Sequence, residues 1–147
     1  MPAPIRVSLS RPARREHLAE LVTFAVDAAR AVGADDGVRH AVRLAVEEVC
    51  LNVMVHGYAG DGTGPLQVEV GRDGDDLMLR IADEAPAFDP ATLPPPRLDA
   101  AAEERRPGGL GWHLVRELMD EVRHEARRPS GNLVTLCKRL GTSATSS

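Results

Sequence analysis

The stretch from Val46 to Tyr58, VEEVCLNVMVHGY, decides the fold of this chain. Its apolar residues predict a buried helix, yet it also contains Glu48, Asn52 and His56. A spacing of four places these three polar side chains on one helical face. Because a buried carboxylate is costly unless it is paired or faces a wet cavity, this helix is the first place to look for chemistry.

The composition fits one globular domain. A chain of 147 residues with 43% hydrophobic content can bury one core and is too short for two domains. A net charge of -4 and an aromatic content of 3% disfavour binding to nucleic acid. The first residues lack an apolar signal region, and no apolar run approaches the roughly 18 residues of a membrane span. We therefore expect a cytoplasmic protein that binds neither nucleic acid nor membrane.

The two cysteines, Cys50 and Cys137, lie in separate apolar runs. Neither has a second cysteine nearby, so the spacing predicts neither a zinc site nor a disulfide. We interpret both as core thiols in a reducing compartment.

Hydrophobic periodicity predicts the order strand, helix, helix, hairpin, lid, helix, hairpin. Alternating residues predict strands, and apolar spacings of three and four predict helices. The predicted strands cover 5–9, 66–70, 77–81, 121–126 and 132–139. The predicted helices cover 13–32, 36–56 and a third that begins at Gly108-Gly109-Leu110-Gly111. Pro12 is expected in the first turn of the first helix, and Asp35 or Asp36 is expected to cap the second.

Hairpins imply antiparallel pairing, and three amphipathic helices must bury their apolar faces. The expected fold is a two-layer α/β sandwich, with a mixed, mostly antiparallel sheet of about five strands and three helices on one face. Residues 1–140 are expected to form this single domain. The proline-rich segment 84–107 has no periodicity and is interpreted as a functional lid, and 141–147 as a disordered tail.

Three local patterns suggest chemistry at a phosphate-bearing ligand. The amide oxygen of Asn52 can bind Mg²⁺ while Glu48 orients or deprotonates a nucleophile, although the pair also fits a simple i, i+4 hydrogen bond. Asp83 ends an apolar strand and can accept a hydrogen bond from an adenine amine, although an Asp before a turn is ordinary turn chemistry. Gly108-Gly109-Leu110-Gly111 can approach an anion at a helix start, but such starts are weakly specific. His56 alone fits a satisfied residue at a helix end.

The order and spacing of these patterns are more specific than any one of them. The set consists of Glu48-x-x-x-Asn52-x-x-x-His56-Gly57-Tyr58, Asp83-x-Ala85-Pro86-x-Phe88-Asp89-Pro90 and Gly108-Gly109-Leu110-Gly111-x-His113. Together they resemble the GHKL ATPase superfamily, and more narrowly its anti-sigma-factor serine/threonine kinases. The resemblance extends from about Ile5 to Leu140. Ala85 stands where the histidine kinases of the superfamily usually have glycine, and Ala-Pro occurs in the anti-sigma branch.

The resemblance implies a Bergerat-type ATP-binding fold. By similarity, Glu48 is the general base, Asn52 coordinates Mg²⁺, and Asp83 binds the adenine amine. Glycines 108, 109 and 111 meet the phosphates, and Arg105 or Arg106 near the end of the lid reaches the γ-phosphate. The candidate nucleotide-binding set is Asn52, His56, Asp83, Ala85, Phe88, Arg106, Gly108, Gly109, Leu110 and Gly111.

The function implied is phosphorylation of a small anti-sigma-factor antagonist protein by Mg-ATP, together with binding of a sigma factor. A homodimer is implied by the same resemblance, with residues 5–32 as its expected interface. Two alternatives are open: a non-catalytic, nucleotide-gated protein that sequesters a sigma factor or another regulator, and a self-contained ATPase.

Overall fold

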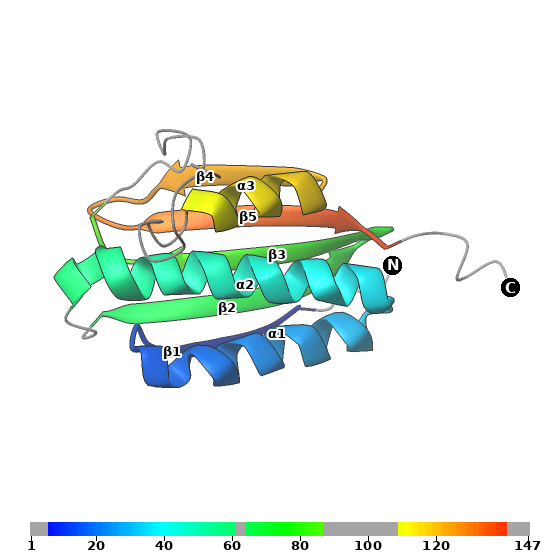
Figure 1. Cartoon of the computed structure of the whole chain (residues 1–147), viewed down its shortest axis with the longest axis horizontal. Coiled ribbons are helices and arrows are strands. Elements are labelled where there is room, and N and C mark those ends of the chain that lie inside the picture. The colour runs from blue at the N-terminus through cyan, green and yellow to red at the C-terminus, as the bar shows by residue number, and fades with distance from the viewer. Residues whose placement is uncertain (1–5, 61–63, 87–108, 141–147) are drawn as a thin grey trace, which may run out of the picture.

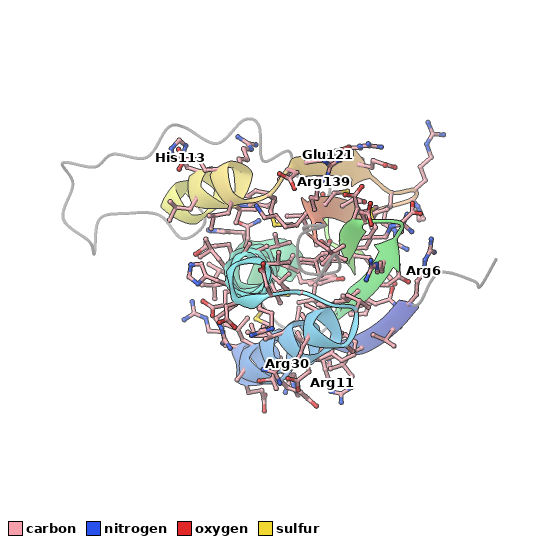
Figure 2. All side chains as sticks on the ribbon, turned by 90° about the vertical axis from the view of Figure 1, so that its right-hand side faces the viewer. Arg6, Arg11, Arg30, His113, Glu121 and Arg139 are labelled. Carbon is pink, nitrogen blue, oxygen red and sulfur yellow. The ribbon has the colours of Figure 1, made fainter. Side chains whose placement is uncertain are left out.

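Five strands form one sheet, and three α-helices lie against one of its faces (Figure 1). The structure, a computed structural model, describes residues 6–60, 64–86 and 109–140. The elements are β1 (Arg6–Pro12), α1 (Leu18–Ala31), α2 (Asp36–His56), β2 (Pro65–Asp73), β3 (Asp76–Asp83), α3 (Gly109–Leu118), β4 (Glu121–Ala126) and β5 (Asn132–Arg139), with 3-10 turns η1 (Arg15–His17) and η2 (Gly57–Gly60). Viewed end-on, the helices lie along one side and the strands along the other (Figure 2).

The sheet has the strand order β1-β2-β3-β5-β4. All four pairings between neighbouring strands are antiparallel. The predicted two-layer sandwich of five strands and three helices is therefore confirmed. The mixed character expected for the sheet is wrong for the described strands, because tight hairpins join β2 to β3 and β4 to β5 and β3 also runs antiparallel to β5.

The start of the first helix differs from the sequence prediction. Pro12 ends the edge strand β1, opposite Pro65, instead of opening a helix. An edge strand tolerates proline because one of its backbone edges has no pairing partner. The Ala13 N–H then donates to the Gly64 carbonyl at 2.9 Å, and α1 begins only at Leu18, after η1.

The central helix α2 matches its predicted range. The Asp35 side chain caps its N-terminus by accepting a hydrogen bond from the Val38 N–H at 2.9 Å, as one of the two predicted caps. The helix ends at His56, and the chain continues through Gly57 in an extended conformation. The C-terminal turns of α2 and the end of β3 face one cavity, which Asn52 and Asp83 both line.

The core lies between the helix layer and the inward face of the sheet, with β3 in the middle of the strand order. Leu79 of β3 is fully buried there. Cys50 of α2 is also fully buried, as predicted for a core thiol. Cys137 is only partly buried, and its thiol contacts Met78 Sδ at 3.2 Å. Its prediction as a core thiol is wrong because the alternation of β5 buries Val134 and Leu136 instead.

Within residues 6–60, 64–86 and 109–140, no helix combines the length and the apolar character needed to cross a membrane.

Replacing Leu79 with alanine should lower the free energy of unfolding by about 2–5 kcal/mol, because it opens a cavity in the middle of the sheet. The matched control is Leu114→Ala on α3, where the leucine is 37% exposed. This control should change stability by about 1 kcal/mol or less. Urea unfolding measures both variants, and equal losses would contradict the placement of the core.

Candidate functional site

A cavity of about 380 Å³ opens between α2, the end of β3, α3 and the β4–β5 hairpin. It brings together residues that are far apart in the sequence. Its lining consists of Val49, Asn52, Val53, His56, Gly57, Asp83, Ala85, Pro86, Trp112, His124, Asn132 and Val134. Four predicted site residues, Asn52, His56, Asp83 and Ala85, thus surround one cavity.

Asp83 is the most buried acidic group of this site, with 3% of its surface exposed. Its Oδ1 accepts hydrogen bonds from the Ala85 N–H at 2.9 Å and from Asn132 Nδ2 at 3.0 Å. Burial raises the pKa of the Asp83 carboxyl above its ordinary value, although the hydrogen bonds from Asn132 and Ala85 oppose the shift. The carboxylate is therefore held by neutral donors at the edge of a partly open, largely apolar cavity.

The β4–β5 hairpin fixes the backbone that follows Asp83. Arg127 donates to the Asp83 carbonyl at 3.0 Å. Ser130 Oγ lies 3.0 Å from the Glu84 carbonyl and 3.1 Å from the Ala85 carbonyl. The hairpin and the segment after β3 consequently form one hydrogen-bonded unit.

Asn132 lines the cavity together with two other residues of this hairpin, His124 and Val134. In the strand register it lies directly opposite Asp83. Its Nδ2 also donates to the Pro86 carbonyl at 3.2 Å, and its Oδ1 lies 2.7 Å from His124 Nε2. The strand register therefore places His124 of β4, Asn132 of β5 and Asp83 of β3 in one continuous row of hydrogen-bonded polar side chains.

Tyr58 ties the end of α2 to the same region. Its hydroxyl accepts a hydrogen bond from the Glu84 N–H at 2.6 Å and donates to the Pro65 carbonyl at 2.7 Å. Burial is the main reason why the pKa of Tyr58 is raised, so the phenol is neutral at pH 7. Three chain segments therefore meet at one hydroxyl group.

The two polar residues of α2 differ in their surroundings. Asn52 is buried and lines the cavity, whereas Glu48 is half-buried and is not among the lining residues. No hydrogen bond joins these two described side chains, so the simple i, i+4 pair is not formed. Burial, and then the neighbouring Glu47, raise the pKa of Glu48. His56 is exposed at the rim, where the helix ends.

Helix α3 closes another side of the cavity. Its first residues are Gly109, Leu110 and Gly111, as the glycine pattern predicts. Trp112 follows with 2% exposure, and its buried indole N–H has no hydrogen-bond partner in the described part of the chain. Predicted residues Phe88, Arg106 and Gly108, together with lid positions 87–107, lie outside the described residues.

The sequence prediction omitted Trp112, His124 and Asn132 from the site. The alternation of His124 with Val122 indicates that both face the helix layer. Asn132 follows the predicted turn at 129–131, but its position opposite Asp83 depends on the pairing of β3 with β5. That pairing is not encoded in a local pattern.

Comparison with known proteins gives one family match, to the histidine kinase-like ATPase domain over residues 11–138. The chain is 35% identical over 103 residues to the serine-protein kinase RsbW of Bacillus licheniformis, and 34% identical over 103 residues to that of Bacillus subtilis. Each alignment covers 67% of this chain and 63% of the relative, so the chain spans less than two thirds of these relatives. The crystal structure of the RsbU and RsbW domains of Rv1364c from Mycobacterium tuberculosis matches with a TM-score of 0.66 and 19% identity, covering 92% of this chain and 32% of that one. This structural likeness confirms the fold.

Gly131 is expected to be essential for the approach of the hairpin to Asp83. Its φ is +133°, and an added Cβ would lie 2.4 Å from the Asp83 carbonyl oxygen. Gly74 is the matched control, because its φ is also positive, at +63°, but an added Cβ meets nothing within 4 Å. Gly74→Ala should lower the free energy of unfolding by about 1–2 kcal/mol, because alanine disfavours a positive φ. Gly131→Ala should lower the free energy of unfolding by about 1–3 kcal/mol more than Gly74→Ala does, because its added Cβ clashes with the Asp83 carbonyl. Equal losses in urea unfolding would show that the hairpin does not need this close approach.

Proposed function

Because this chain belongs to the histidine kinase-like ATPase domain family, we propose that its cavity binds ATP and that the protein transfers the terminal phosphate to a serine or threonine hydroxyl. The observation that supports this most directly is Asp83, a buried carboxylate on the wall of a cavity also lined by Asn52. The names of its relatives, serine-protein kinases, support the reaction class.

The residues around the cavity fit the adenine end of a nucleotide. Asp83 offers a carboxylate acceptor for the exocyclic amine. The aliphatic Val49, Val53 and Val134 supply the apolar walls that a flat base requires. The buried indole of Trp112 adds an aromatic side chain to this wall.

Asn52 is proposed to hold Mg²⁺ through its amide oxygen. This ion favours near-octahedral oxygen coordination and usually takes most of its ligands from phosphates and water. Within the described residues, no group of three or more His, Cys, Asp and Glu side chains could hold a metal ion. A single neutral ligand from α2 suits an Mg²⁺ ion that arrives bound to the nucleotide. The ion would offset the negative charge of the phosphates.

Glu48 is the proposed general base for the acceptor hydroxyl. Its half-buried position, one helical turn before Asn52, and a pKa that burial raises above the ordinary value suit a proton acceptor. Glycines 108, 109 and 111, with Leu110, are proposed to meet the phosphates at the start of α3. Arg106 is proposed to reach the γ-phosphate, and Phe88 and the segment 84–107 are proposed to cover the nucleotide.

The proposed substrate is a small antagonist protein, and the proposed second partner is a sigma factor. These partners follow from the resemblance to anti-sigma-factor kinases. A homodimer, with residues 5–32 at its interface, is proposed on the same ground.

A second candidate function is a nucleotide-gated binding protein that sequesters its partner without phosphate transfer. The position of Glu48 outside the cavity lining favours this alternative, because a base must reach the reacting hydroxyl. In both functions the cavity binds ATP, so a measurement of phosphate transfer separates them.

Asp83→Asn should weaken ATP binding by about 10- to 100-fold, since a hydrogen bond to a charged group contributes about 1.5–3 kcal/mol. The matched control is Asp73→Asn, at the exposed end of β2, which should bind as the wild type does. Calorimetric titration with ATP and Mg²⁺ measures Kd for each protein. Wild-type binding by Asp83→Asn would remove Asp83 from the proposed site, and absence of binding by the wild type would refute the proposed function.

Glu48→Gln should lower the rate of phosphate transfer by about 100- to 10,000-fold and leave ATP affinity unchanged. Glu117→Gln is the control, because Glu117 is exposed on α3 and is not among the residues that line the cavity. The measurement uses labelled ATP and a candidate antagonist protein, with phosphoserine and phosphothreonine as the products. Full transfer by Glu48→Gln would show that Glu48 is not the base. ATP-dependent partner binding without transfer by the wild type would favour the sequestering protein.

A further inference from the structure

Three polar side chains form a continuous chain beneath the cavity, and each comes from a different strand. His124 of β4 lies 2.7 Å from Asn132 Oδ1, and Asn132 of β5 donates through Nδ2 to Asp83 Oδ1 of β3 at 3.0 Å. The register pairs Asn132 with Asp83 directly. His124 pairs with Val134, so it stands diagonally from Asn132 on the same face of the sheet.

The direction of each hydrogen bond follows from the chemistry of its ends. Asp83 Oδ1 and the Pro86 carbonyl are both acceptors, and both lie within hydrogen-bond distance of Asn132 Nδ2. The amide nitrogen must therefore face them, which turns Oδ1 of Asn132 toward His124. His124 Nε2 consequently carries a proton and donates.

The carboxylate of Asp83 is asymmetric as a result. Oδ1 receives both the Asn132 amide and the Ala85 N–H. Among the described residues, no donor is hydrogen-bonded to Oδ2. This second oxygen is the one that can accept a hydrogen bond from a ligand in the cavity.

We propose that His124 and Asn132 are positioning residues that orient Asp83 toward the exocyclic amine of a 6-aminopurine and so enforce selection against 6-oxopurines. This proposal rests on the proposed ATP-binding function. His124 fixes the Asn132 amide, and the fixed amide holds Oδ1 and leaves Oδ2 for the ligand. Without His124, Asn132 Oδ1 loses this hydrogen bond, and the contacts of Nδ2 with Asp83 and the Pro86 carbonyl are left to hold the amide, so Nδ2 is positioned less firmly against Oδ1 of Asp83.

The groups that face Asp83 also determine how its charge responds to pH. They are Cys50 of α2, Tyr58 after α2, His124 of β4 and Arg127 in the hairpin. Burial raises the pKa of both the Cys50 thiol and the Tyr58 phenol, so both are neutral at and below pH 7. Loss of ATP binding at acid pH is therefore assigned to protonation of the Asp83 carboxyl, whose pKa is raised mainly by burial.

The test compares the affinities for ATP and for inosine triphosphate, whose base has an oxygen in place of the amine. His124→Leu removes the donor, His124→Gln retains an amide donor, and His113→Leu is the control. His113 lies on α3 (Figure 2), is half-exposed, pairs with Glu117 and is not among the residues that line the cavity. Calorimetry with each nucleotide at several pH values gives both the preference for ATP and the pH at which ATP binding is half lost.

In His124→Leu, the affinity for ATP should fall by about five- to tenfold, and that for inosine triphosphate should change little. The acid midpoint of ATP binding should also move to higher pH. The ionised carboxylate binds the amine, and loss of an oriented donor raises the pKa of Asp83. His124→Gln should recover most of the preference, and His113→Leu should match the wild type.

An unchanged preference and an unchanged acid midpoint in His124→Leu, with the wild type binding ATP, would overturn this inference alone. Failure of the wild type to bind either nucleotide would instead overturn the proposed function. If circular dichroism shows that His124→Leu is unfolded, His124→Asn replaces it, because the same amide on a shorter side chain cannot span the distance to Asn132. An equal preference in His124→Asn and His124→Gln would then overturn the inference.

Discussion

The structure depends on the burial of one carboxylate, Asp83, at the end of the central strand β3. Removing such a group from water is costly unless donors replace the lost hydration. Here the donors are the Ala85 N–H and the Asn132 amide, and their positions require that β5 begins opposite the end of β3. The same arrangement requires glycine at position 131, where the hairpin backbone approaches the Asp83 carbonyl closely. One polar group thus couples the strand order of the sheet to the shape of the cavity.

Local patterns in the sequence were sufficient for most of the fold. The range of α2, its cap at Asp35 and both hairpins follow from periodicity and from turn residues that act within a few positions. The errors concern long-range pairing. Pro12 belongs to an edge strand because the pairing of β1 with β2 extends as far as Pro65, and Cys137 faces outward because β5 buries its alternate residues.

The candidate site was predictable in part for the same reason. Asn52 and Asp83 stood out because a polar group in an apolar helix and an acid at a strand end are local signals. The strand register places His124 and Asn132 at the cavity, and the packing of α3 over the sheet places Trp112 there. Nearby residues in the sequence therefore do not predict that these three belong to the site. Glu48 illustrates the converse: its spacing from Asn52 is regular, yet only Asn52 lines the cavity.

Trp112 gives this protein a built-in optical signal. It is the only tryptophan of the chain, and its indole lies in the cavity wall with its N–H buried. Indole emission responds to the polarity of its surroundings and to hydrogen bonding at that nitrogen. The intrinsic fluorescence of the protein therefore comes mainly from one position. A change in its emission maximum or intensity reports on the wall of the cavity without an added label.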